Sequence, residues 1–258
     1  MLTVVAHNGG VALGAWDGGQ MVGFVFGFIG TDDAEVHRPA MARLKHCSHM
    51  LAVLPEYRDK GVGCILKLAQ REAVMKQGIR LITWTYDPLE SRNAHLNIAR
   101  LGTVCNTYKR EVYGEMRDPL NAGLPSDRFQ VDWWITSQRA KKRLSGERPG
   151  LSFQSFAAAN TPILNPTTLN AAGLPQMIQN ITEPLGALGL VEIPADFQTL
   201  KTADISLARE WKARIRSIFE SAFEAGYIVT DFLYETIEGR PRSFYVLSQG
   251  DARLGGES

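Results

Sequence analysis

The chain has 258 residues, which allows one large domain or two small ones. Its 45% hydrophobic and 21% charged residues are ordinary for a globular protein, and no apolar run is long enough to cross a bilayer. A net charge of +1 argues against a broadly basic surface for nucleic acid or membrane, and three cysteines without CxxC spacing indicate reduced thiols in a cytoplasmic protein.

The first half of the sequence predicts alternating strands and helices. The expected strands span residues 11–16, 21–29, 47–54, 80–86, 108–113 and 129–135, and the expected helices span residues 62–77 and 91–101. The first two strands are joined by Asp17–Gln20 as a β-hairpin. Gly78 and Gly102 are placed to end the two helices. This order predicts an α/β (α+β) fold built on a mixed sheet.

The stretch from Leu51 to Leu66 carries the strongest functional signal. A short apolar run ends at Pro55, and a turn with two glycines and two cations, Arg58–Gly63, leads directly into a helical pattern. Backbone N–H groups of such a turn and the dipole of the following helix both point at a bound anion. Glycine at positions 61 and 63 lets a ligand approach the backbone closely. The sequence therefore predicts a phosphate-binding loop.

Two familiar phosphate loops do not fit. A Walker loop requires Gly-Lys-Ser/Thr, but Cys64 follows Gly63, and a dinucleotide-binding fingerprint requires a third glycine where Leu66 stands. The string Val53–Gly63 instead resembles the acetyl-CoA pyrophosphate loop of the GNAT acyltransferases, with Arg-x-x-Gly-x-Gly at its end. The likeness extends from about Val11 to Ile135.

The resemblance implies an acyl-CoA co-substrate and a set of residues that bind it. The pyrophosphate would lie on the loop residues Arg58, Asp59, Lys60, Gly61, Val62 and Gly63. The strand before the loop would give a backbone N–H to the thioester carbonyl, with Ala52 and Val53 nearest. Asn93, which precedes Ala94 and Leu101-Gly102 in the pattern that family members carry, would hydrogen-bond the CoA arm.

The catalytic residues are less well marked. Asp87 and Glu90 follow the carboxyl end of a strand and are candidates for the general base, although the sequence favours the structural interpretations of a turn residue before Pro88 and of a first-turn helix carboxylate. Many GNAT members carry a tyrosine acid at the position of Ile98, so Tyr108 or Tyr113 would have to replace it. No metal is expected, because His46 and His49 on a strand point to opposite faces.

The second half of the chain resembles the C-terminal α/β extension of a bacterial GNAT subgroup, through Ile193–Phe197 and Gly226-Tyr227. We expect a GNAT core at residues 1–138, an irregular linker at 139–186, and a strand-helix-hairpin extension at 187–258 packed on the core. Its strands are expected at 189–194, 227–234 and 243–247, and its helix at 207–225.

The sequence given lacks the strand and helices that usually precede the hairpin in this family. The strand Val11–Trp16 would then have an unpaired edge, which a segment encoded upstream, another part of the chain or a second copy in a homodimer would cover. We favour the upstream segment.

The resemblance implies an N-acyltransferase that moves an acetyl or succinyl group from coenzyme A to a primary amine of a small molecule such as an amino acid, by direct attack. Neither nucleic acid nor membrane is an expected partner. The alternative is a non-catalytic acyl-CoA-binding or interaction protein.

Overall fold

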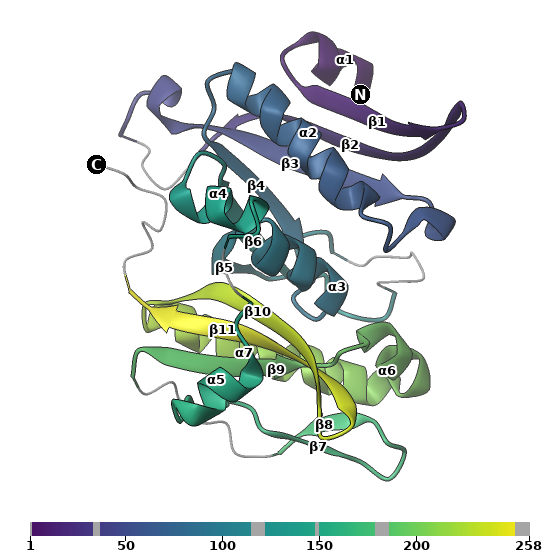
Figure 1. Cartoon of the computed structure of the whole chain (residues 1–258), viewed down its shortest axis with the longest axis vertical. Helices are drawn as coiled ribbons and strands as arrows, with labels where there is room; N and C mark the ends of the chain where they lie inside the picture. The colour runs from purple at the N-terminus through teal and green to yellow at the C-terminus, as the bar shows by residue number, and fades with distance from the viewer. Residues whose placement is uncertain (1, 33–36, 115–121, 148–149, 179–185, 251–258) are drawn as a thin grey trace. The chain divides into compact units, whose positions relative to one another are not determined.

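A computed structural model describes residues 2–32, 37–114, 122–147, 150–178 and 186–250 (Figure 1). The chain divides into two units, Met1–Trp84 with Asp132–Lys141 (unit 1) and Thr85–Val131 with Lys142–Gly256 (unit 2). Each unit is considered by itself. Residues 251–258, the end of the expected extension, lie outside the described part. The expected division at residues 138 and 186 differs from these units and stays a prediction.

Unit 1 contains strands joined in the order β1-β2-β3-β4, with the end of β6 beside β4. Its elements are α1 (Leu2–His7), β1 (Val11–Asp17), β2 (Gln20–Thr31), η1 (Ala40–Arg43), β3 (Leu44–Val53), η2 (Pro55–Tyr57), α2 (Val62–Lys76), β4 (Leu81–Tyr86), β6 (Arg128–Trp134) and α4 (Gln138–Leu144). The last three of these also contribute residues to unit 2. β1, β2 and β3 pair antiparallel, whereas β3 and β4 pair parallel, so the sheet is mixed.

Helix α2 lies across β1, β2 and β3 in unit 1 (Figure 1). A Cβ atom on Gly23 would lie 3.2 Å from the Leu66 side chain, so glycine on β2 lets the helix approach the sheet. Val25 and Val74 are fully buried between them. Burial of such side chains contributes about 1.5–3 kcal/mol each, and this packing fixes the helix that starts at the glycine loop.

Unit 2 contains strands in the order β6-β5-β10-β11-β9. Its elements are α3 (Ser91–Ala94), η3 (His95–Arg100), β5 (Val104–Lys109), α5 (Phe153–Ala158), β7 (Thr167–Leu169), β8 (Pro175–Met177), β9 (Leu188–Ile193), α6 (Phe197–Ala203), α7 (Ile205–Glu224), β10 (Tyr227–Ile237) and β11 (Arg240–Gln249). β7 and β8 form a separate two-stranded hairpin.

Side chains alternate along β11, so they point to both faces of the unit 2 sheet. A helix covers each of these faces. On one face, Tyr245 and Phe129 pack against Phe219 of α7, with the Phe129 and Phe219 ring centroids 4.6 Å apart. On the other face, Phe244 stacks on Phe153 of α5 at 5.0 Å. These apolar layers form the core of unit 2.

The predicted α/β fold with a mixed sheet is confirmed, and so are the β-hairpin, the loop strand, the loop helix and the C-terminal helix and hairpin. The prediction of a strand at 108–113 is wrong, because β5 ends at Lys109 and Glu111 has a positive φ of 46° in a turn. The helix expected at 91–101 changes to a π-helix at His95, where Leu101 N–H bonds Leu96 O. Such widened turns are rare and are often found at functional sites.

The segment at 139–186 is not irregular throughout. It contains α4, α5 and the β7–β8 hairpin, and Phe156 and Leu164 in it are buried. Its weak periodicity misled the prediction, because helices of six and seven residues are too short to show a clear helical pattern. Helix α6, with seven residues, was also missed.

Candidate functional site

The glycine loop of unit 1 has the backbone geometry of an anion-binding turn. Gly61 caps helix α2 with a left-handed φ of 80°, and no side chain caps the helix start. The N–H groups of the first turn, from Val62 to Cys64, therefore face outward without an intrahelical partner. A Cβ on Gly61 would meet no atom within 4 Å, so the space beside the backbone is open. The loop can accept a phosphate group.

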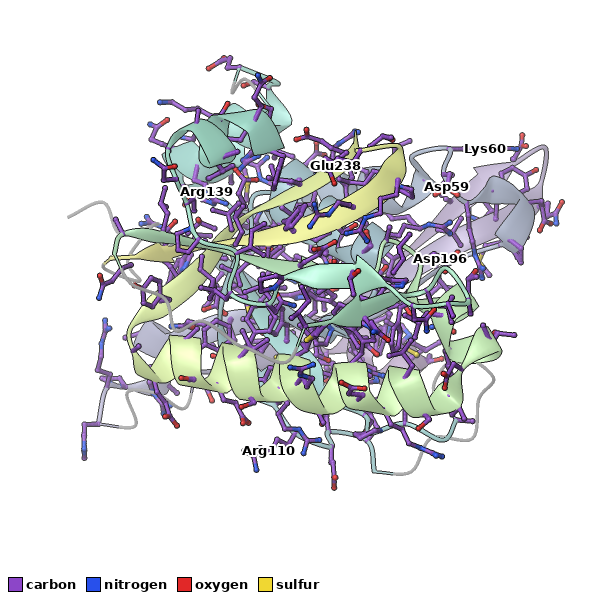
Figure 2. The ribbon with its side chains drawn as sticks, turned by 90° about the horizontal axis from the view of Figure 1, so that it is seen from below. Asp59, Lys60, Arg110, Arg139, Asp196 and Glu238 are labelled. Carbon is purple, nitrogen blue, oxygen red and sulfur yellow. The ribbon has the colours of Figure 1, made fainter. Side chains whose placement is uncertain are left out.

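The two cations of the loop are held differently. Nε of Arg58 donates to Val53 O at 3.4 Å, which ties its side chain back toward β3. The Lys60 ammonium lies 5.0 Å from the centre of the Tyr57 ring. Tyr57 OH in turn donates to Asp17 in the hairpin turn at 2.8 Å. Figure 2 shows Asp59 and Lys60 at an outer edge of the ribbon, so Lys60 is exposed and able to reach an anion in solution.

Strand β3 separates from β4 before it reaches the loop. The parallel pairing joins only His46 to Ile82 and Cys47 to Thr83 among the described residues. The pairing of β3 with β2 shifts by one residue beyond Gly27, which leaves His49 as a bulge. Bulges bend a strand and are frequent beside active sites. The half of β3 that approaches the loop thus pairs on one side only.

Of the two strand residues expected to contact the thioester, Val53 has the suitable orientation. Leu54 N–H bonds Val22 O on β2 at 2.9 Å. Because successive N–H groups of a strand point to opposite sides, Ala52 also faces β2, where it is paired with Phe24. The Val53 N–H points to the other side, on which the described residues supply no ladder partner. It is available to bond a carbonyl oxygen.

A buried polar network behind the loop was missed by the sequence reasoning. The Lys67 ammonium donates to Ser48 Oγ at 2.7 Å and lies 3.5 Å from the centre of the Trp84 ring. Ser48 Oγ donates to Gln70 Oε1 at 2.9 Å, and Gln70 Nε2 lies 3.2 Å from His46 Nε2. Burial holds the pKa of Lys67 well below its usual range, and burial and the Lys67 charge lower the pKa of His46 to about 4.

The signal for that network lies in the helix α2 itself. The apolar stripe expected there was Val62, Ile65, Leu66, Ala69 and Ala73, but the buried side chains are Leu66, Lys67, Gln70 and Val74. Ile65 is 62% exposed. Positions 67, 70 and 74 share one helix face, so Lys67 and Gln70 beside Val74 mark a face that is buried yet polar.

In unit 2, Asp87 is held in an ion-pair cluster. Its Oδ2 lies 2.5 Å from Lys212 Nζ and 3.5 Å from Arg128 Nη1, and its Oδ1 accepts a hydrogen bond from Leu89 N–H at 3.0 Å. A carboxylate with these partners is bound to buried cations and to the backbone, and these groups belong to the structure. These contacts favour a structural role for Asp87 over that of a general base.

Glu90 lies beside this cluster with fewer partners. Its Oε1 accepts a hydrogen bond from the side-chain amide of Gln198. Burial raises the pKa of Glu90 above its usual range, the Gln198 hydrogen bond lowers it, and the charge of Asp87 raises it. A carboxylate with a raised pKa is suited to general base catalysis near neutral pH.

Tyr108 is bound to another carboxylate. Its OH donates to Asp127 Oδ2 at 3.0 Å, and Asp127 also accepts both guanidinium hydrogen bonds of Arg216, at 2.7 and 2.9 Å. Burial, the charge of Asp127 and this hydrogen bond raise the pKa of Tyr108. These effects make it a weaker acid, and they favour a structural role.

Asn93 is exposed in the short helix α3, directly before the π-helix η3. Ile98, at the position where many GNAT members carry a tyrosine, is fully buried in η3. Within the described residues no three His, Cys, Asp or Glu side chains are grouped to hold a metal ion, and no helix is long and apolar enough to cross a membrane.

No protein-family model and no curated protein matches the chain. Several solved structures share its fold in part. One is a GNAT-family protein from Desulfovibrio desulfuricans, 17% identical, with a TM-score of 0.38 over 51% of this chain and 72% of that chain. Another is a GNAT acetyltransferase from Elizabethkingia anophelis with acetyl-CoA bound, 11% identical, with a TM-score of 0.39 over 50% and 78%.

A third is an IAA acetyltransferase from Bacillus cereus, 14% identical, with a TM-score of 0.38 over 48% and 77%. The names of these three proteins describe acetyltransferases.

Proposed function

We propose that this chain is an acyl-CoA-dependent N-acyltransferase. The observation that carries the proposal is the sequence of features in unit 1: a strand that leaves its parallel neighbour, an outward Val53 N–H, and a glycine turn capping α2. The turn fits a pyrophosphate and the strand N–H fits a thioester carbonyl. The Val53 N–H and the glycine turn follow each other along the chain, so one long ligand that carries a thioester and a pyrophosphate could contact both.

The reaction needs few protein groups. Acyl-CoA supplies an activated thioester carbonyl. The nitrogen lone pair of a neutral amine forms the new C–N bond, the C–S bond breaks, and its electron pair stays on sulfur. The proton lost by nitrogen goes to a base, and the departing thiolate takes a proton from solvent. The Val53 N–H stabilises the negative charge that develops on the carbonyl oxygen.

Within this proposal Glu90 is the general base, because burial raises its pKa and its hydrogen-bond partner among the described residues is the neutral amide of Gln198. Asn93 is proposed to bond the CoA arm, and Arg58 and Lys60 add charge at the pyrophosphate. The acceptor is proposed to be the primary amine of a small molecule such as an amino acid, and the acyl group acetyl or succinyl.

A screen of thiol release tests the proposal. Acetyl-CoA and succinyl-CoA are offered with a panel of amino acids and polyamines, and released thiol is measured for the natural chain and for Glu90→Gln. Amine-dependent release that Glu90→Gln reduces supports the proposal. The structural partners of Asp87 and Tyr108 favour one alternative, a non-catalytic acyl-CoA-binding protein. CoA binding without thiol release for any amine would establish that alternative.

A further inference from the structure

The segment from Tyr86 to Ser91, which carries the candidate base, is held by the C-terminal part of unit 2. Tyr86 OH and Tyr245 OH lie 3.1 Å apart, and Tyr245 OH donates to Pro88 O at 2.8 Å. Ser91 Oγ and Ser243 Oγ lie 2.8 Å apart. All of these side chains are buried. Strand β11 therefore holds the backbone on both sides of Glu90.

Helix α6 reaches the carboxylate itself. Asp196 caps this helix, with its Oδ1 accepting from Thr199 N–H at 3.0 Å and its Oδ2 accepting from Thr199 OH at 2.7 Å. Phe197 and Leu200 are 2% and 1% exposed and anchor the helix in the core. Gln198 is thus held in one place, where its amide donates to Glu90 Oε1.

The charged groups around Glu90 act on its pKa in both directions. Asp87 and Asp196 raise the pKa of Glu90, and Lys212 lowers it. Asp87 is itself neutralised by Lys212 and by Arg128. Against the dominant effect of burial, the strongest influence that favours the carboxylate form is the Gln198 hydrogen bond. A neutral amide donor stabilises a carboxylate without adding a charge that would repel an amine substrate.

We propose that Gln198 is a positioning residue for Glu90, so that the C-terminal extension takes part in the acyl transfer rather than only covering the sheet. The inference rests on the proposed function, in which the Glu90 carboxylate takes the proton from the attacking nitrogen. Gln198 binds one carboxylate oxygen and leaves Oε2 to accept that proton. It also fixes the plane of the carboxylate.

The test compares Gln198→Met, which keeps the length of the side chain but removes the donor, with Thr202→Val on the same helix. Thr202 is exposed, and among the described residues its hydroxyl donates to the Gln198 carbonyl at 2.9 Å, so its loss leaves the Glu90 contact in place. Two quantities are measured in the full chain. One is the titration of the Glu90 carboxyl carbon by NMR, assigned with Glu90→Gln, and the other is the pH profile of kcat/KM for thiol release.

In Gln198→Met the Glu90 titration and the acid limb of the kcat/KM profile are expected to move together to higher pH. On the acid limb kcat/KM should fall several-fold, while KM for acyl-CoA stays unchanged. Thr202→Val should match the natural chain. An unmoved titration overturns the inference, and so does a moved titration with an unmoved acid limb. Absence of thiol release from the natural chain overturns the proposed function instead, while the titration still decides whether Gln198 controls Glu90.

Discussion

The Nζ atom of Lys212 lies 2.5 Å from Oδ2 of Asp87, and the two side chains are 2% and 11% exposed. Residue 212 belongs to helix α7, and residue 87 follows strand β4. The pair therefore joins two parts of unit 2 that are 125 residues apart in sequence. A buried charge without its partner is costly, so this contact has a measurable consequence.

Replacing Asp87 with Asn is expected to lower the free energy of unfolding by about 3–5 kcal/mol, because Lys212 stays buried without a carboxylate. Chemical denaturation monitored by circular dichroism measures the loss. The matched control is Arg110→Ala, which breaks the exposed Arg110–Glu220 pair at 2.6 Å in the same unit (Figure 2 labels Arg110). Its effect should be much smaller. A loss of unfolding free energy in Asp87→Asn as small as that in Arg110→Ala would show that the Asp87 pair does not stabilise unit 2.

The glycine loop gives a prediction about binding. Gly61→Val is expected to weaken CoA binding at least tenfold, about 1.4 kcal/mol, because a side chain enters the open space beside the turn. Lys60→Ala should weaken it modestly, since the backbone carries most of the geometry. Gly63→Val is expected to behave like Gly61→Val. Isothermal titration calorimetry with CoA measures all three.

Gly78→Ala is the matched control for Gly61→Ala. Both glycines flank helix α2, with φ values of 76° and 80° and no atom within 4 Å of an added Cβ. Each alanine should cost about 1–2 kcal/mol of stability through backbone strain. Only the change at Gly61 should also reduce CoA affinity. Unchanged affinity in the Gly61 and Gly63 variants would contradict the assignment of the loop.

Much of unit 1 could be predicted because its signals are local. The turn Asp17–Gln20, the two glycines of the loop and the helix stop at Gly78 each lie within a few residues of the element they define. The orientation of helix α2 could not be predicted. A hydrophobic pattern scores Lys67 as a surface residue, but its partner Ser48 lies on a strand 19 residues earlier. Contact with that strand decides which face is buried.

The candidate catalytic residues show the same limit in unit 2. The position of Asp87 and Glu90 after a strand was visible in the sequence. Their roles were not, because Lys212 and Gln198 come from elements more than a hundred residues away. Tyr108 likewise has its partner outside its own strand, because its OH donates to Asp127, and Arg216 in turn binds Asp127. Local patterns locate such groups, but residues distant in sequence decide what they bind.

The network around His46 predicts a pH dependence of stability. The pKa of His46 is lowered to about 4 in the folded chain from 6.5, so the unfolded chain binds more protons between these values. Stability is therefore fully present above pH 6.5 and is lost as the pH falls toward 4, by on the order of 3 kcal/mol. His46→Gln should flatten this part of the profile in chemical denaturation. His49→Gln, at an exposed position of the same strand, should not. Identical slopes in all three proteins would rule out His46 as the cause.

The last prediction concerns the part of the chain expected from sequence to be the core. A fragment of residues 1–140 keeps Phe129 and Asp127 but removes the residues that cover them. Phe129 packs against Phe219 and Tyr245, with ring centroids 4.6 and 5.4 Å apart. The Asp127 side chain has no exposed surface, and its ion-pair partner is Arg216.

Without α7 and β11 the fragment therefore exposes aromatic surface and loses the partner of a buried carboxylate. We expect insoluble or molten material, with far-ultraviolet circular dichroism retained, near-ultraviolet circular dichroism lost and strong binding of a hydrophobic dye. The full chain, measured in parallel, should unfold cooperatively. A soluble fragment that unfolds cooperatively would show that residues 1–140 form a core by themselves, and that the C-terminal extension is added to it rather than required by it.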